Sequence, residues 1–176
     1  DVANSGSPHF GATLYTPGER CDVVVSGTHA YVADGLSGLQ IIDVTDPRLP
    51  QLVGTLDTHG RVRSVAVSGT HAFVTDTNSG FHVVDITNPQ SPQIVGSATQ
   101  VGYCNGVAVS GTYAYVLNYG GLLVIDVANP SSPQIVGNLQ TPGVTSGIVL
   151  SSTHAYIAVE SAGLQVIDIR KPTSPQ

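Results

Sequence analysis

The sequence contains no methionine or tryptophan, only two cysteines, and only six basic residues in 176. Charged residues make up 10% of the chain, against roughly a quarter in typical globular domains, and the formal net charge is −6. So few cations cannot neutralise a run of phosphates, and we therefore expect no nucleic-acid partner. Hydrophobic residues nevertheless make up 41% of the chain, enough to exclude disorder and to supply the core of one domain.

Long apolar runs are missing as well. No segment approaches the roughly 18 apolar residues that cross a bilayer, so we expect no membrane span. The chain starts at Asp1 rather than Met, and we expect a mature product or an excised fragment. Cys21 and Cys104 are too few and too far apart for a zinc framework. Both a disulfide and two free thiols are compatible with that spacing.

Catalytic motifs are the third absence. The chain has no GxSxG nucleophile motif and no HExxH metal motif. We therefore expect no metal, no cofactor and no catalytic residues. The sequence leaves open whether the protein is an enzyme, and favours a protein without catalysis.

What the sequence does contain is one stretch written four times. Its clearest copy is LLVIDVANP at Leu122–Pro130, and the others are Leu39–Pro47, Phe81–Pro89 and Leu164–Pro172. The aspartates in these copies, which are Asp43, Asp85, Asp126 and Asp168, are 42, 41 and 42 residues apart. A fixed period of this length signals a repeat architecture. We read residues 1–176 as one domain, with a partial strand in 1–18, full units at 19–60, 61–102 and 103–143, and a partial unit at 144–176.

Each unit reads as four short antiparallel strands. In the second unit, strands are expected at 62–67, 71–75, 81–86 and 93–98, separated by Gly-containing turns and a proline-stiffened loop. No helical periodicity is present. Runs such as Val23–Val25 are apolar on both faces, which is typical of a sheet covered on both sides. Four-stranded sheets stacked on one another predict an all-β fold, a β-propeller with four blades per chain. A β-solenoid is the rival, but its repeats are usually shorter.

The pattern LxVIDVxNPxxPxxVG, preceded by VAVSGxxAYV, resembles the LVIVD repeat family of bacterial and archaeal surface proteins. Gly106–Gly111 and Leu122–Gly137 fit this pattern closely, and the resemblance covers essentially the whole chain. It implies a β-propeller that is extracellular or at the cell surface. It brings no catalytic residues, because the biochemical role of the family is undefined.

The phase of the repeat leaves a strand at each end. His9–Tyr15 is expected to be an orphan fourth strand, and Pro172–Gln176 stops where another fourth strand should begin. We expect the N-terminal strand to pair with the C-terminal blade, because a bare third strand would expose unpaired backbone groups. This pairing could close a four-bladed monomer, an eight-bladed homodimer or a filament, or the chain could belong to a larger ring. Blades without bulky aromatics favour the dimer, whereas a Cys21–Cys104 disulfide would fit only the four-bladed ring.

The loops divide onto two faces. The first-to-second strand turns, which hold His29, His71 and His154, share one face with the proline loops and barely vary between units. We interpret these histidines, and the repeated aspartates, as structural groups that stabilise turns. The opposite face holds loops that differ between units, which is where a repeated scaffold carries specificity. The expected ligand-binding residues there are Arg20, Asp22, Arg61, Arg63, Tyr103, Asn105, Asn118 and Tyr119.

Three functions are compatible with these sequence features. The first is a non-catalytic interaction module that binds a protein or a glycan through the variable loops, where Arg and Tyr side chains suit an anionic or sugar ligand. The second is a structural tile assembled by strand exchange. The third is a hydrolase or lyase acting in the central channel with Asp22, Arg63 and Cys104 at its mouth.

Overall fold

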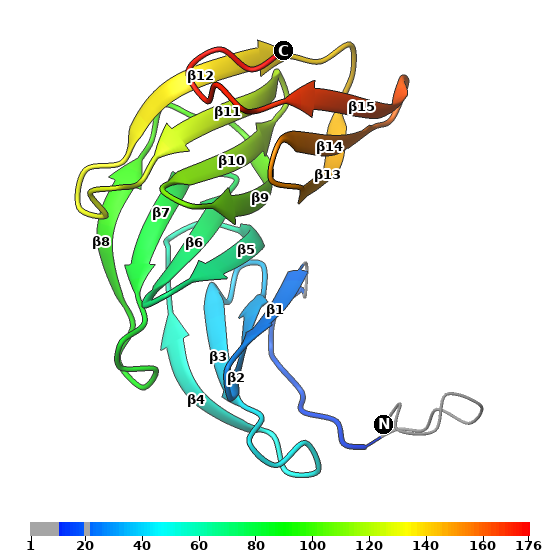
Figure 1. Ribbon diagram of the computed structural model, residues 1–176. Coiled ribbons are helices and arrows are strands. Elements are labelled where there is room, and N and C mark those ends of the chain that lie inside the picture. The colour runs from blue at the N-terminus through cyan, green and yellow to red at the C-terminus, as the bar shows by residue number, and fades with distance from the viewer. Residues whose placement is uncertain (1–10, 20–21) are drawn as a thin grey trace.

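The computed structural model describes residues 11–19 and 22–176, and this part of the chain contains fifteen strands and no helix (Figure 1). None of the described residues therefore lies in a helix capable of spanning a membrane. The strands are β1 Asp22–Ser26, β2 His29–Ala33, β3 Leu39–Asp43, β4 Gln51–Leu56, β5 Val62–Ser68, β6 His71–Asp76, β7 Gly80–Asp85, β8 Gln93–Ala98, β9 Cys104–Ser110, β10 Tyr113–Asn118, β11 Gly121–Asp126, β12 Gln134–Gln140, β13 Thr145–Leu150, β14 His154–Val159 and β15 Gly163–Asp168.

The strands form four separate antiparallel sheets, one for each repeat unit. Blades 1, 2 and 3 are the four-stranded sheets β1–β4, β5–β8 and β9–β12, and blade 4 is the three-stranded sheet β13–β15. Consecutive strands are neighbours in every sheet. The strands of the second unit begin and end within one residue of the predicted positions. The predicted all-β propeller architecture is therefore confirmed.

Local sequence explains the hairpin between the first two strands of a blade. In blade 2, Ser68 pairs with His71 across a two-residue turn, and Gly69 adopts a φ of 59°. This left-handed conformation carries no Cβ penalty for glycine. The hairpin is tied to the end of the third strand, because the Ile86 N–H donates to the Thr70 carbonyl at 2.9 Å. The same bond recurs in each of the other blades, so this face is held by one repeated contact.

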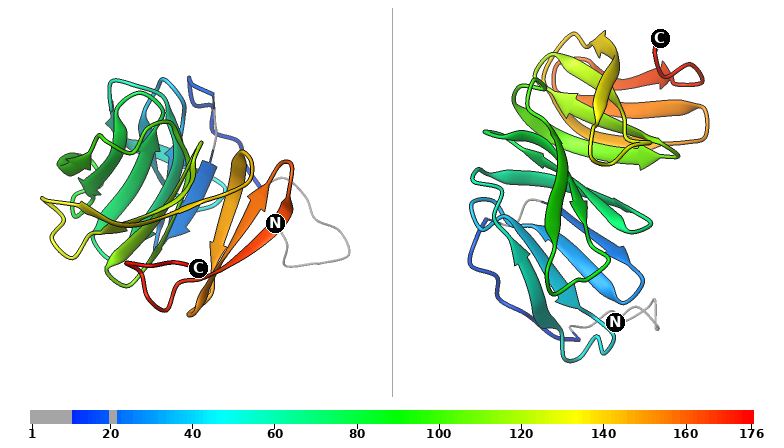
Figure 2. Two further views of the ribbon diagram at one scale, coloured as in Figure 1. Left: turned by 90° about the horizontal axis from the view of Figure 1, so that it is seen from above. Right: turned by 90° about the vertical axis from the view of Figure 1, so that its left-hand side faces the viewer.

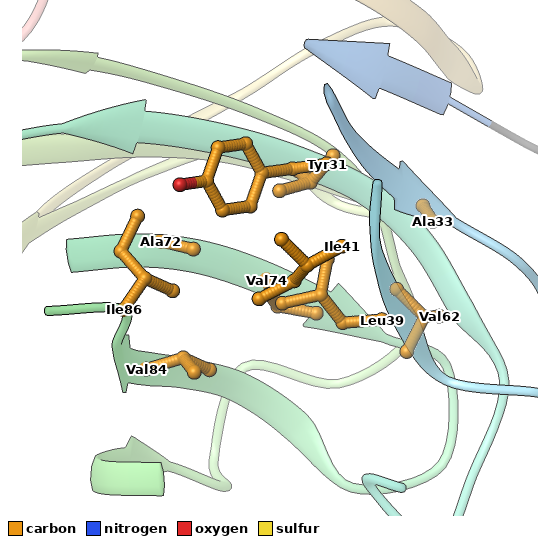
Figure 3. Close-up of a cluster of buried hydrophobic side chains, with 10 residues drawn as sticks. Tyr31, Ala33, Leu39, Ile41, Val62, Ala72, Val74, Val84 and Ile86 are labelled. Atoms are coloured by element: carbon orange, nitrogen blue, oxygen red, sulfur yellow. The ribbon is translucent and has the colours of Figure 1, made fainter. Parts of the chain in front are cut away.

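The core lies between the blades rather than at the centre of the ring. Blade 1 places Tyr31, Leu39 and Ile41 against Val65 and Val74 of blade 2 (Figure 3). We call the surface that a blade turns toward the next blade its leading face, and the opposite surface its trailing face. Two further layers of this kind join blade 2 to blade 3 and blade 3 to blade 4. Each fully buried Leu, Ile or Phe stabilises such a layer by about 1.5–3 kcal/mol.

The four blades are arranged as an open arc. Their first strands line the inside of the arc, and β1 contacts β5, β5 contacts β9, and β9 contacts β13. The fourth strands β4, β8 and β12 run along the outside, as Figures 1 and 2 show. The arc stays open between the first and the last blade (Figure 1).

The predicted pairing of the N-terminal segment with the C-terminal blade is not found among the described residues. Residues 11–16 form no strand, while His9 and Phe10 lie outside the described part of the chain. Leu14 instead packs at the other end of the arc, on Ala30, Val32 and Ile42 of blade 1. An N-terminal segment held on blade 1 cannot also reach the fourth blade of an open arc. The expected homodimer stays a prediction.

Candidate ligand-binding face

A repeated hydrogen bond brings two loops together on the variable face of the propeller. In blades 2, 3 and 4, the residue just after the second strand donates its N–H to a carbonyl in the loop that precedes the first strand. These bonds run from Thr77 N to Arg61 O at 3.0 Å, from Tyr119 N to Tyr103 O at 3.3 Å, and from Glu160 N to Val144 O at 2.9 Å. The backbone frame is thus the same in three blades, and the side chains mounted on it differ. We call this surface the paired-loop face.

Buried polar residues hold these loops in place. Asp76 is fully buried at the end of β6, and its carboxylate accepts bonds from Thr58 Oγ1 at 2.5 Å and from the N–H groups of Asn78 and Ser79. Asp34 has the same place in blade 1, where it accepts from Thr16 Oγ1 and Gly18 N. Burial alone would raise the pKa of Asp76, but the three donors outweigh it and hold that pKa below the ordinary 3.8.

Asn118 is the counterpart of these aspartates in blade 3. Its Nδ2 donates to the Val101 carbonyl at 2.9 Å, and its Oδ1 accepts from Gly120 N at 2.9 Å. The amide is thus used on both sides to shape the loops. Asn118, expected to bind ligand, is engaged in supporting the paired-loop face.

Two exposed tyrosines lie side by side on this face. Tyr103 and Tyr119 come from the two loops of blade 3, and their ring centroids lie 4.6 Å apart at a tilt of 38°. They are 38% and 59% exposed, respectively. The backbone bond between them fixes their spacing. Flat rings with polar hydroxyls, held this way, suit the apolar face and the hydroxyl groups of a sugar.

An ion pair links the neighbouring loops of blades 1 and 2. Arg61 Nη1 contacts Glu19 Oε2, and Glu19 is the more exposed partner. A surface pair of this kind contributes about 0–1 kcal/mol to stability, so the guanidinium remains available to an anionic ligand at little cost. Arg20, the neighbouring candidate, lies outside the described residues.

The first strands of the four blades line a polar cleft of about 230 Å³ on the inside of the arc. Its lining includes Asp22, Arg63 and Asn105, three of the expected site residues. Ser64 Oγ donates to Asp22 Oδ2 at 2.6 Å, and the Val65 N–H donates to the same oxygen at 3.1 Å. Asn105 Nδ2 donates to the Thr145 carbonyl in the next blade. The cleft is thus built from polar bonds that cross between blades.

The structure therefore groups the predicted residues into three places. Asp22, Arg63 and Asn105 share the cleft, Tyr103 and Tyr119 form the aromatic pair, and Arg61 joins Glu19. Sequence reasoning missed Glu19 and Ser64. Both contact a partner 42 residues away, so the repeat period itself was the signal that could have found them.

Cys104 does not lie at the mouth of the channel, where the third functional hypothesis placed it. It is fully buried between blades 2 and 3, beside Phe73 and Phe81, and its thiol is free. Burial raises the pKa of this thiol to about 12, and the nearby Asp76 adds to the effect. Its side chain points into that interblade core because Cys104 occupies the position of Val62 in the repeat. Cys21 lies outside the described residues.

The repeated aspartates act as turn-stabilising groups, as the sequence indicated. The carboxylate of each aspartate accepts a hydrogen bond from the backbone N–H of the residue two positions later, at 2.8–2.9 Å. This holds for Asp43, Asp85, Asp126 and Asp168. Arg170 also bonds the Asp168 carboxylate and holds its pKa at about 2. Residues 11–19 and 22–176 contain no group of three or more His, Cys, Asp or Glu side chains placed to hold a metal ion.

Comparison with known proteins assigns the repeat. The model of the LVIVD repeat matches four consecutive segments, at residues 17–58, 59–100, 101–141 and 142–176. The chain belongs to the LVIVD repeat family. LVIVD repeats occur in general in surface proteins of bacteria and archaea. No curated protein sequence matches this LVIVD chain.

Solved structures show the same fold. The computationally designed protein Ika4 is 10% identical to the LVIVD chain, with a TM-score of 0.73, and the match covers 91% of this chain and 97% of Ika4. The computationally designed protein Ika8 is 11% identical with a TM-score of 0.70, and the match covers 86% of this chain but only 46% of Ika8. Likeness at this identity supports the fold alone.

Proposed function

We propose that this chain is a non-catalytic interaction module of an exported or cell-surface protein, and that its paired-loop face binds a glycan or a protein ligand. The observation that carries the proposal is the repeated backbone frame, which presents a different side-chain pair in each of blades 2, 3 and 4. Binding residues lie disproportionately on loops that a rigid scaffold holds in place, and these loops are of that kind. The occurrence of LVIVD repeats in surface proteins supports the location.

A glycan fits the face best. The tyrosine pair offers exposed aromatic rings, and Arg61 before blade 2 and the polar cleft supply donors for hydroxyl or carboxylate groups. A cleft of about 230 Å³ accommodates a monosaccharide unit, not a folded chain. A protein ligand would instead insert single side chains there.

The experiment is a binding screen of the intact chain against an array of surface glycans and against labelled surface proteins. The variant Tyr119→Ala removes one of the two rings, and we expect it to weaken binding at least tenfold, while Tyr119→Phe retains most of the affinity. The control is Tyr113→His on the opposite face, which installs the residue that units one, two and four carry. Binding that survives both Tyr119→Ala and Arg61→Ala, or no binding to any probe, contradicts the proposal.

A structural tile is the second candidate. The specific observation in its favour is the exposure of apolar side chains on the two terminal blades, where a further copy of the chain could pack.

A further inference from the structure

The leading face of blade 4 exposes apolar side chains that every other blade buries. Leu164 and Val166 on β15 are 65% and 53% exposed. The residues at the Leu164 position in the other blades are Leu39, Phe81 and Leu122, and those at the Val166 position are Ile41, Val83 and Val124. None of these six is more than 1% exposed, because the next blade covers them. Blade 4 therefore presents half of an interblade layer with no second half.

The trailing face of blade 1 shows the complementary defect. Val23 and Val25 on β1 are 59% and 63% exposed. Val65 and Val107 hold the Val23 position in blades 2 and 3, and both are buried against the preceding blade. The two exposed faces are thus the two sides of one contact that the chain already makes three times.

The N-terminal segment already lies where a preceding blade would place the end of its fourth strand. Leu14 packs on Ala30, Val32 and Ile42. One period later, Leu56 at the end of β4 packs on the cluster that contains the equivalent residues of blade 2, which are Ala72, Val74 and Val84. The bond from Thr16 Oγ1 to Asp34 at 3.1 Å likewise repeats as the bond from Thr58 Oγ1 to Asp76. The segment around Leu14 therefore contacts blade 1 as the fourth strand of a preceding blade would, and the arc contains no such blade.

The outer edge of β15 shows where a further strand can pair. Asp168 exchanges two backbone hydrogen bonds with Gln176. The same pairing opens the fourth strand of every other blade, as Asp43 with Gln51, Asp85 with Gln93 and Asp126 with Gln134. Beyond this pair, the edge of β15 that faces away from β14 has no strand partner among the described residues. An open strand edge of this kind is a template for another chain.

We propose that a second copy of this chain fills both gaps and that two chains form an eight-bladed ring with twofold symmetry. The Leu14 segment of each chain completes the partner's blade 4, and the Leu164 and Val166 face packs on the partner's Val23 and Val25. Within one arc these surfaces do not meet, because each blade makes its extensive strand contacts with the adjacent blade only. A twofold arrangement covers the exposed apolar faces of both chains and pairs the open edge of β15 in both.

The repeat also fixes the register of the exchanged strand. In blade 1, Leu39 pairs with Leu56 and Gln40 pairs with Thr55, whose hydroxyl donates to Gln40 Oε1 at 3.0 Å. In the proposed ring, blade 4 of one chain takes its fourth strand from the other chain. The residues at the equivalent repeat positions are then Leu164 paired with Leu14, and Gln165 paired with Thr13. The contacts between the two chains are therefore of the same kinds as the contacts between blades within one chain.

The first test is the molar mass of the native chain by light scattering after size-exclusion chromatography. The expected value is twice the chain mass of 18.1 kDa. Leu164→Asp should convert the dimer to monomer, whereas the matched control Leu49→Asp, at an equally exposed loop residue, should leave it intact. The chain mass for the unaltered protein, or a polydisperse mass above two chains, overturns the twofold ring.

A cross-linking test separates exchange between chains from closure within one chain. Leu14→Cys and Leu164→Cys are made in separate chains that also carry Cys21→Ser and Cys104→Val, and the two chains are mixed, unfolded and refolded together. A covalent heterodimer under oxidation supports the proposal. No covalent heterodimer from the mixture, together with an internal disulfide in a chain carrying both cysteines, overturns it in favour of a self-closed propeller.

Discussion

Gly96 on the fourth strand of blade 2 lies directly against the backbone carbonyl of Pro130 in the proline loop of blade 3. A Cβ added at Gly96 would stand 2.1 Å from the Pro130 oxygen and 2.9 Å from Pro133 Cδ. The same approach recurs between Gly54 and Pro89 and between Gly137 and Pro172. Each lies next to a register shift between the third and fourth strands. The missing side chain thus sets how closely the outer parts of successive blades approach.

Gly96→Ala should therefore destabilise the chain by about 1–3 kcal/mol, the usual cost of forcing extra atoms into a packed contact. The neighbour that must yield is backbone and a proline ring, so local relaxation is limited. The measurement is the midpoint of chemical unfolding. Gly147→Ala is the matched control, since an added Cβ there has no atom within 4 Å. Equal losses for the two variants would refute the spacing role.

Asp76→Ala should cost about 1–3 kcal/mol of unfolding free energy, because it leaves the Thr58 hydroxyl and two backbone N–H groups without their acceptor. Asp76→Asn should cost less, since Asn118 serves the same position in blade 3. Urea unfolding of both variants at pH 7 measures the difference. A more severe effect from Asn than from Ala would contradict the acceptor role.

The same carboxylate makes stability depend on acid pH. The pKa of Asp76 is lower in the folded chain than its ordinary 3.8, so its contribution is complete above that value and is lost as pH falls through the folded pKa. The difference in unfolding free energy between the native chain and Asp76→Asn should therefore shrink as the pH falls below about 4. A difference that stays constant over this range would show that the ionised form is not what stabilises the loops.

His82 should add a second pH dependence near neutrality. Its ring is buried between Ser79 Oγ and Ser97 Oγ, each at 2.8 Å, and burial lowers its pKa below 6.5 although Asp76 opposes the shift. The neutral ring thus stabilises the fold above pH 6.5, and this stability is lost as pH falls through the lowered folded pKa. His82→Gln installs the residue found at Gln40 and Gln165 and should flatten the stability profile as the pH falls below about 6.5. An unchanged profile would exclude His82 as the titrating group.

Cys104 should resist alkylation in the native chain at pH 8. Its thiol has no exposed surface, and its pKa of about 12 leaves almost no thiolate. Peptide mass spectrometry after iodoacetamide treatment should find Cys104 unmodified until denaturant is added. An engineered Ser146→Cys in the polar cleft on the inside of the arc is the control and should react readily. Rapid labelling of both sites would mean that blades 2 and 3 separate often.

The strands could be predicted because most of them are bounded by turns that contain glycine or proline at a fixed period, and these residues act locally. The turn role of Asp85 could be predicted for the same reason, since its acceptor bond reaches only to Thr87. The burial of Cys104 could not, because a strand apolar on both faces does not reveal which side chain enters the interblade layer. The Glu19–Arg61 pair and the Asp22–Ser64 bond join residues one period apart in neighbouring blades. Only the stacking of the blades brings them together.

The chain's extensive strand contacts run from each blade only to the next. The stability of each blade therefore depends on its own hydrogen bonds and on the layers that it shares with its immediate neighbours. Blade 4 has three strands and a single neighbour, and opening it breaks one layer rather than two. Amide protons of β15 should therefore exchange with solvent sooner than those of β6 or β10, which belong to the two middle blades. Protection of β15 that increases with protein concentration would mean that a second copy of the chain packs on blade 4.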